Sequence, residues 1–266
     1  MKGYAMATVA VTAISLSACG GGGQGVASIP PPPIKQPDSP SQLLVHATQD
    51  TEFTSIGSDI RIRWDESANQ YEIMLPGAEW ARLSSAGNEL SILDANGDKT
   101  GSVFSGGTYS YTGLATVQPS GGSPSFFAYG IPTPQSEVPT VGSASYTAEF
   151  AGSGGGYSVG GLADLDFDFA AGTLTGSMKA SANDTAGWGP YDLGTYDLHN
   201  TVYSSGSSTF SGALSRDGAA AGSFNGMFAG PQAQELMGQW QLLFQDFYAP
   251  DHTVNASGVF IGRRRP

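Results

Sequence analysis

The sequence holds a single cysteine, Cys19, in 266 residues. One cysteine cannot form a disulfide within the chain, which excludes a small fold held together by disulfides. Basic residues are also few, since 11 Lys and Arg stand against 23 Asp and Glu and give a formal net charge of −12. Nucleic acids are bound by clusters of Lys and Arg, so this balance argues against a nucleic-acid partner. The one basic run, Arg263 to Arg265, is expected to be a solvated end of the chain.

Sequence motifs for catalysis and metal binding are absent as well. The chain has no nucleophile elbow, no phosphate-binding loop, no HExxH motif and no Cys/His cluster at metal-binding spacing. Its three histidines, His46, His199 and His252, stand far apart in sequence. The run 94–98 resembles a calcium loop but lacks the full ligand spacing and the distal Glu, so we expect a turn closed by side-chain hydrogen bonds. These absences predict a protein that is not an enzyme and holds no metal or cofactor.

No stretch after residue 40 shows the sustained 3.6-residue periodicity of a helix. Instead the chain has 38 glycines, only 13% charged residues, and segments in which apolar and polar residues alternate. This pattern predicts an all-β protein with many short strands and tight turns. A small β domain is expected over 41–135, with strands at 60–64, 71–75 and 89–93 and a hairpin of 108–118 with 125–131.

A second domain is expected over 136–266, because prolines at 132, 134 and 139 mark a boundary. Its alternating segments predict eight antiparallel strands, which can close into a barrel without a free edge. They are expected at 143–150, 161–169, 173–180, 191–203, 209–215, 222–228, 239–247 and 258–263. Pro231 is suited to begin a helix and Gly238 to end it, so 231–237 is predicted to form one or two helical turns.

Three aspartates alternate with apolar residues in the second of these strands: Asp164, Asp166 and Asp168. Alternate residues of a strand share one face, so the three carboxylates lie together. We expect them on the solvated outer face, with the apolar residues pointing inward. The alternative is a site for a cation or a basic partner.

The N-terminus has the features of a secretion signal. Lys2 precedes an apolar segment, 5–16, that is too short to span a membrane as a helix. The residues Leu16-Ser17-Ala18-Cys19 resemble a bacterial lipobox, which predicts a signal peptide over 1–18 and lipidation of Cys19. The alternative is an ordinary secretion signal followed by a cysteine without a role. Residues 19–40 are rich in Gly and Pro and are expected to form a tether. A glycine, Gly20, follows the cysteine, and in this the chain resembles lipoproteins that are sorted to the outer membrane.

Two further sets of motifs carry a resemblance to a known family. The stretch 222–238 reads GSFNGMFAGPQAQELMG, and the last expected strand reads GVFIGR at 258–263. Upstream lie YGIPTP at 129–134, VPT at 138–140 and GSASYT at 142–147. In this order the motifs resemble the transferrin-binding protein B family of bacterial surface lipoproteins. The resemblance implies a small "handle" domain followed by an eight-stranded β-barrel.

This resemblance implies an outer-membrane, surface-exposed lipoprotein that binds a protein or small-molecule ligand without catalysing a reaction. Ligands of the family range from iron-carrying or complement-regulating host proteins to haem and small solutes. An outer-membrane translocator or receptor would be a further partner. The alternative is a structural or assembly lipoprotein that coats the envelope and binds no specific ligand.

One segment, 181–203, gathers aromatic and polar residues, which are Trp188, Tyr191, Tyr196, His199 and Tyr203. Aromatic rings with polar tips on loops are typical of contact surfaces. We therefore expect these five residues to bind the ligand, and haem is a specific candidate because a histidine or tyrosine can serve as its axial ligand. The alternative is that the rings close the mouth of the barrel or cover its wall.

Overall fold

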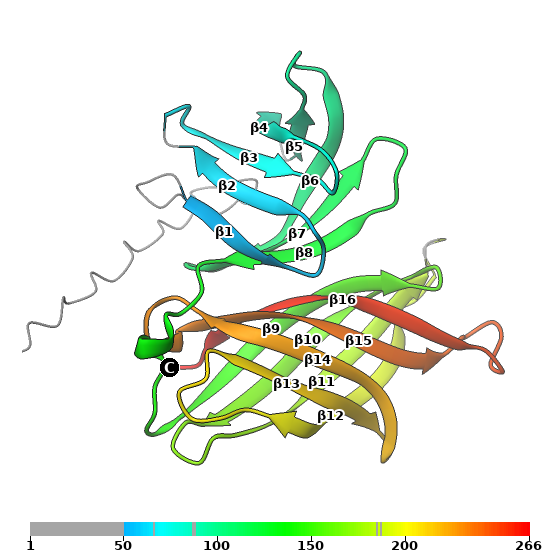
Figure 1. Ribbon diagram of the computed structural model, residues 1–266. Helices are drawn as coiled ribbons and strands as arrows, with labels where there is room; N and C mark the ends of the chain where they lie inside the picture. The colour runs from blue at the N-terminus through cyan, green and yellow to red at the C-terminus, as the bar shows by residue number, and fades with distance from the viewer. Residues whose placement is uncertain (1–50, 66, 87–88, 185, 187) are drawn as a thin grey trace, which may run out of the picture. The chain divides into compact units, whose positions relative to one another are not determined.

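The computed structural model describes residues 51–266 except 66, 87–88, 185 and 187. The described chain is all-β, as the sequence predicts, and forms two closed barrels of eight antiparallel strands each (Figure 1). The expected signal peptide, Cys19 and the tether over 19–40 lie outside the described residues. Within the described part, no helical segment has the length and apolar character to cross a membrane.

The first barrel runs from Thr51 to Gly130, and each strand pairs with the next. Its strands are β1 (Thr51–Ile56), β2 (Arg61–Asp65), β3 (Gln70–Met74), β4 (Trp80–Ala86), β5 (Glu89–Leu93), β6 (Lys99–Thr108), β7 (Thr112–Pro119) and β8 (Ser125–Gly130). The barrel closes where β1 pairs with β8, with Thr54 opposite Gly130. The predicted small β domain is therefore itself a barrel, and β1, β4 and β6 are strands that the sequence pattern did not reveal.

The second barrel follows after the short 3₁₀ turn Gln135–Glu137. Its strands are β9 (Ser143–Gly154), β10 (Tyr157–Asp168), β11 (Thr173–Asp184), β12 (Tyr191–Val202), β13 (Thr209–Arg216), β14 (Ala219–Ala229), β15 (Glu235–Gln245) and β16 (Thr253–Arg264). β16 pairs with β9 and closes the barrel. Along β10, Leu165 and Phe167 are buried while Asp164 and Asp166 are exposed. The predicted eight-stranded barrel and the outward-facing aspartates are thus confirmed.

The predicted helix over 231–237 is wrong. Only Pro231–Ala233 forms a 3₁₀ turn, and β15 already begins at Glu235. Gly230 and Gln232 have φ angles of 71° and 54°, which lie in the left-handed region and stop a right-handed helix from continuing. The expected loop over 181–203 is also shorter than predicted, because β11 extends to Asp184 and β12 begins at Tyr191.

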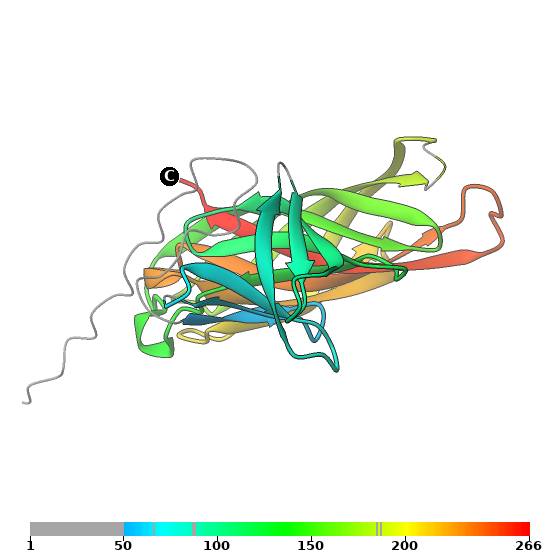
Figure 2. The ribbon, with the colours of Figure 1, turned by 90° about the horizontal axis from the view of Figure 1, so that it is seen from above.

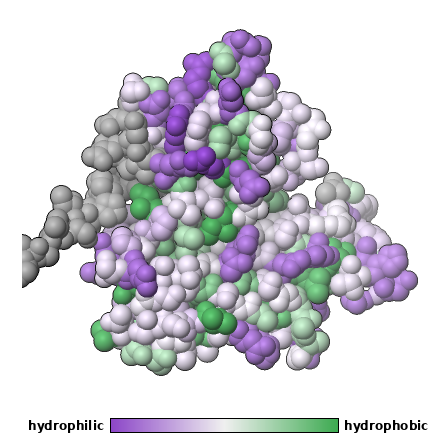
Figure 3. All heavy atoms as spheres, viewed as in Figure 1, coloured by the Kyte–Doolittle hydropathy of each residue, from purple (hydrophilic) through white to green (hydrophobic). Residues whose placement is uncertain are grey.

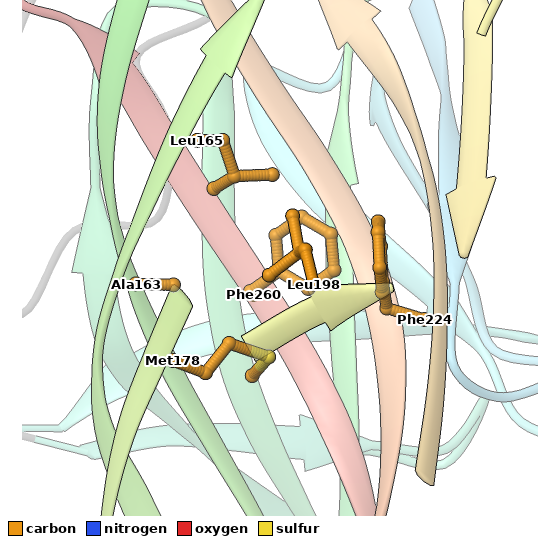
Figure 4. A pocket seen from close by; sticks show the side chains of 6 residues that line it. All are labelled: Ala163, Leu165, Met178, Leu198, Phe224 and Phe260. Atoms are coloured by element: carbon orange, nitrogen blue, oxygen red, sulfur yellow. The ribbon is translucent and has the colours of Figure 1, made fainter. Parts of the chain in front are cut away.

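Side chains fill the interior of the second barrel. The ring of Phe167 packs against those of Tyr203, Phe210 and Phe228, with centroids 4.8 to 5.2 Å apart. The cavity drawn in Figure 4 lies between Ala163, Leu165, Met178, Leu198, Phe224 and Phe260 and has a volume of about 10 Å³. That is about the space of one water molecule. This part of the barrel is therefore a packed core with no room for a ligand, as expected for eight strands.

The two barrels belong to the same structural unit and share an apolar contact. Outward-facing residues of β7 and β8 pack on those of β15 and β16; the buried ones are Leu114, Ala128, Met237, Val259 and Ile261. Every position of 235–238 and 259–262 is buried as a result. Along these two segments, alternate side chains face the interior of the second barrel, and the side chains between them face the first barrel.

The C-terminal arginines are exposed, as expected, but they are not free. The guanidinium of Arg265 forms an ion pair with Asp164, and its Nε donates a hydrogen bond of 2.9 Å to Oγ1 of Thr147. Arg263 lies over the ring of Tyr109, with its Cζ 5.5 Å from the centroid. One carboxylate of the aspartate row thus already has a cationic partner within the chain.

Candidate functional site

The second barrel has two different ends. The hairpins β9–β10, β11–β12, β13–β14 and β15–β16 all turn at one end, whereas the chain enters β9 and leaves β16 at the other. Figures 1 and 2 show the β11–β12 and β15–β16 hairpins reaching out together, opposite the C-terminus. We call the end at which these four hairpins turn the distal end.

Aromatic side chains gather at the distal end. We define the distal aromatic cluster as Tyr157, Trp188, Tyr191, Phe247 and Tyr248, which come from three hairpins. Trp188 is 68% exposed, Tyr248 65% and Phe247 37%. The ring of Tyr191 stacks on that of Phe247, with centroids 4.2 Å apart and planes at 19°. Tyr157 contacts both rings edge-on from below the exposed residues.

Hydrogen bonds hold these exposed rings in place. The Tyr248 hydroxyl donates to Asp184, so it accepts the 2.7 Å hydrogen bond from the Tyr191 hydroxyl. The other oxygen of Asp184, Oδ1, accepts the backbone N–H of Trp188 at 2.8 Å. The β11–β12 and β15–β16 hairpins are therefore joined by a chain of tyrosine hydroxyls that ends on a carboxylate.

A second carboxylate supports the same loop from its other side. Oδ1 of Asp246 accepts the Tyr157 hydroxyl and the backbone N–H of Tyr248, both at 2.9 Å. The two hydrogen bonds hold the pKa of Asp246 below its ordinary value, and the bond from the backbone N–H of Tyr248 has the largest effect. The hydrogen bond to Asp184 is the main cause that raises the pKa of Tyr248. Asp246 is therefore ionised and Tyr248 neutral at physiological pH.

The structure separates the five residues that the sequence singled out. Trp188 and Tyr191 belong to the distal aromatic cluster. Tyr196 is fully buried inside the barrel, where the guanidinium of Arg216 lies 6.0 Å from its ring centroid. Tyr203 is buried near the opposite end against Phe167. His199 is exposed on the outer wall of the barrel, on β12. The five residues therefore do not form one surface.

Sequence reasoning missed Tyr157, Asp184, Asp246, Phe247 and Tyr248. Four of them come from outside 181–203: Tyr157 joins it because β10 pairs with β11, whereas Asp246, Phe247 and Tyr248 join it through barrel closure. The loop 246–251 reads DFYAPD, with two aromatics and a proline between strands. The criterion that selected Trp188, aromatic residues on a polar loop, would also have selected Phe247 and Tyr248.

Metal binding is not supported by the described residues, among which no group of His, Cys, Asp and Glu is arranged to hold an ion. The 94–98 run forms the expected turn. Oδ1 of Asp94 accepts the backbone N–H groups of Asn96 and Asp98 at 2.8 and 2.9 Å. The carboxylate that would bind calcium is thus used to close the turn.

Residues 105–264 match the protein family described as the C-lobe and N-lobe β-barrels of transferrin-binding protein B. The chain belongs to this transferrin-binding protein B family. The match covers the whole second barrel and begins within β6, so it also includes the last strands of the first barrel. The resemblance read from the sequence motifs is confirmed, and the distal aromatic cluster lies on the matched barrel.

Solved structures that are similar to this chain include members of this family. A double mutant of transferrin-binding protein B from Haemophilus parasuis shares 15% identity at a TM-score of 0.48, covering 80% of this chain and 45% of that one. The isotype 1 protein from serogroup B Neisseria meningitidis shares 16% at 0.46, covering 80% and 43%. This chain therefore spans less than half the length of those transferrin-binding proteins.

A third similar structure is HpuA from Kingella denitrificans, solved in complex with human haemoglobin. It shares 15% identity at a TM-score of 0.47, and the match covers 88% of this chain and 93% of that one. No curated protein matches the sequence.

Proposed function

We propose that this chain is a non-catalytic binding protein of the bacterial cell surface that captures a protein ligand at the distal end of its second barrel. The observation that carries the proposal is the distal aromatic cluster, in which exposed aromatic residues are supported by hydrogen bonds of their hydroxyl or backbone N–H groups to Asp184 and Asp246. Membership of a family named for transferrin binding supports a protein ligand, with an iron-carrying protein as the first candidate.

Rigid exposed aromatics suit a protein partner for a physical reason. Trp and Tyr have few rotatable bonds and large contact areas, so burying them on binding costs little conformational entropy. Here the stack of Tyr191 on Phe247 and the hydroxyl chain through Tyr248 already fix the rings before a partner arrives. Such preorganisation lowers the cost of association.

A small-molecule ligand finds less support. The cavity inside the second barrel is about 10 Å³, far below the several hundred Å³ that a haem or drug-sized ligand needs. His199, the histidine considered for haem iron, stands on the outer wall, while Tyr196 and Tyr203 point into the core. Capture of haem or another small solute would have to use the outer surface alone.

The sequence supplies the rest of the proposal. We infer that lipid on Cys19 anchors the mature chain in the outer membrane and that residues 19–40 act as its tether. We assign the first barrel to the handle domain of this family. An outer-membrane translocator or receptor is the expected second partner, since a tethered binding protein has to deliver what it captures.

The test is capture of serum proteins by the full-length protein in detergent, immobilised through a C-terminal tag. Trp188→Ala and Tyr248→Ala should each weaken capture by about tenfold or more, as truncation of an interface anchor does. The matched control is Phe104→Ala, which removes an aromatic that is 44% exposed on β6 of the first barrel. If capture is unchanged in both distal variants, the distal end is not the binding site. If the wild-type protein captures nothing, the result favours the envelope-coating alternative.

A further inference from the structure

The charge around the distal aromatic cluster points to the chemistry of its partner. The distal hairpins and the strand ends beside them carry one arginine, one histidine and five aspartates, which are Asp184, Asp192, Asp217, Asp246 and Asp251. Two of these support the exposed aromatic residues: Asp184 accepts the Tyr248 hydroxyl and the backbone N–H of Trp188, and Asp246 accepts the backbone N–H of Tyr248. In Figure 3 the hairpin end on the right shows strongly hydrophilic residues next to a hydrophobic patch.

The cations at this end offset only part of the negative charge of the aspartates. Arg216 forms an ion pair with Asp217 at 3.7 Å, and its Cζ lies 6.0 Å from the ring centroid of Tyr196. His252 lies 3.9 Å from Asp251 on an exposed turn. Asp192 and Asp246 accept hydrogen bonds from uncharged donors, namely backbone N–H groups and the Tyr157 hydroxyl. Lys179 lines the same surface hollow as Asp192. The remaining negative charge of this end faces the solvent and is available to a partner.

We infer that the distal aromatic cluster binds a basic protein segment, in which Lys or Arg side chains lie on the rings of Trp188 and Tyr248 while their charge faces the surrounding aspartates. This inference rests on the proposed function and names the class of its partner. Aromatic faces attract cations, and Arg also stacks flat on a ring. Carboxylates beside the rings strengthen the attraction and exclude acidic partners.

The geometry allows the charge to be changed without disturbing the loops. Asp246 accepts the Tyr157 hydroxyl and the N–H of Tyr248 through its Oδ1, and Asp192 accepts the N–H of Gly194 through its Oδ1 at 2.8 Å. An asparagine keeps that oxygen, so D192N/D246N removes two charges and retains these bonds. The matched control is D94N/D168N, because Asp94 and Asp168 also accept backbone N–H groups through Oδ1 alone and lie away from the distal end.

The first experiment measures the local field in the full-length protein. Trp188 is the exposed one of four tryptophans, since Trp64 and Trp240 are buried and Trp80 is half-buried. The difference in fluorescence between wild type and Trp188→Phe therefore reports this ring. At low ionic strength we expect caesium to quench it about twofold or more better than iodide, relative to free tryptophan. D192N/D246N should reduce that ratio and D94N/D168N should not; equal quenching by both ions overturns the inference.

The second experiment uses nona-arginine and nona-glutamate as probes. Nona-arginine should change Trp188 fluorescence, and its affinity should fall about tenfold between 50 and 300 mM salt and about threefold in D192N/D246N. Nona-glutamate should not bind. If D94N/D168N weakens nona-arginine binding as much as D192N/D246N does, the peptide is attracted to the acidic chain in general, and the inference of a distal site is overturned.

The two proposals fail in different ways. Serum capture that needs Trp188 but is unchanged in D192N/D246N and in high salt leaves the distal site standing and removes the basic partner. Serum capture that is unchanged by Trp188→Ala contradicts the proposed function itself, whatever the ratio of caesium to iodide quenching is.

Discussion

The carboxylate of Glu235 in the second barrel accepts the backbone N–H of Tyr111 in the first barrel at 2.9 Å. The same carboxylate accepts the N–H of Ser110 and the hydroxyl of Thr112, also at 2.9 Å. Glu235 is 5% exposed and lies where the chain enters β15. One acidic side chain of the second barrel thus satisfies three donors of the turn between β6 and β7.

Replacing Glu235 by alanine should destabilise the protein. The substitution leaves the donors of Tyr111 and Thr112 buried without an acceptor and removes the acceptor of half-buried Ser110, which we expect to cost about 3 kcal/mol in the free energy of unfolding. Urea denaturation followed by tryptophan fluorescence measures the loss. The control is Glu52→Ala, whose ion pair with Arg61 is exposed and should contribute less than about 1 kcal/mol. Equal effects of the two substitutions would contradict the role of Glu235.

The stability of the protein should depend on pH through the same residue. Burial is the main cause that raises the pKa of Glu235 above its ordinary value of 4.5, against the opposing hydrogen bonds. The folded state then binds its proton more tightly than the unfolded state. The contribution of Glu235 to stability is therefore largest below pH 4.5 and falls as pH rises through the raised pKa.

The measurement compares wild type with Glu235→Gln from pH 4 to 8 by thermal unfolding. The stability of wild type relative to the variant should decrease as pH rises. Glu149, whose pKa is also raised by burial, is present in both proteins and cancels in the difference. A difference that stays constant or grows with pH would mean that the pKa of Glu235 is not raised.

Exposed and buried tryptophans of the second barrel should respond differently to truncation. Trp188→Ala should change the free energy of unfolding by less than about 1 kcal/mol, since the ring is 68% exposed. Trp240→Ala should cost about 3 to 5 kcal/mol, because that ring is buried and its Nε1 donates to the carbonyl of Val259 at 3.1 Å. Chemical denaturation monitored by circular dichroism separates the two. A large loss for Trp188→Ala would place its ring in the seal of the barrel.

Gly57, at the tip of the β1–β2 hairpin, should not tolerate a side chain. A Cβ at this position would lie 2.2 Å from Cγ1 of Val259 in the second barrel, and the φ angle of 101° disfavours any other residue. Gly57→Ala should therefore loosen the contact between the barrels and speed proteolysis in the 131–142 connection. Gly97→Ala is the control, since it has a φ of 87° but open space around it. Identical digestion of both variants would argue against the contact.

The N-terminal anchor is tested at Cys19. Cys19→Ser should abolish labelling by radioactive palmitate and leave an uncleaved precursor or a protein released from membranes. The lipobox supplies the reason, because the acyl chains are attached through the thiol. Palmitate incorporated equally into the Ser variant contradicts lipidation at this residue.

The sequence alone was sufficient where a property belongs to one strand or one local motif. The alternation of Leu165 and Phe167 with Asp164 and Asp166 determines which face of β10 points inward, since side chains of a strand alternate. The Asp94 turn and the family motifs of 222–238 are local in the same sense. The all-β class and the eight-stranded second barrel followed from such patterns.

Tertiary structure decided what depends on residues far apart in the chain. Pro231 and Gly238 suit the first and last positions of a helix, but the chain forms a strand from Glu235. Leu236 and Met237 are both buried there, because Leu236 faces the barrel core and Met237 belongs to the contact with the first barrel. Tyr191 meets Phe247 and Tyr248 only because barrel closure brings the β11–β12 hairpin beside the β15–β16 hairpin. No local pattern encodes such neighbours. The sequence therefore determined the strands and the class of the protein, whereas packing between hairpins and between barrels decided which aromatic residues form a surface and which form the core.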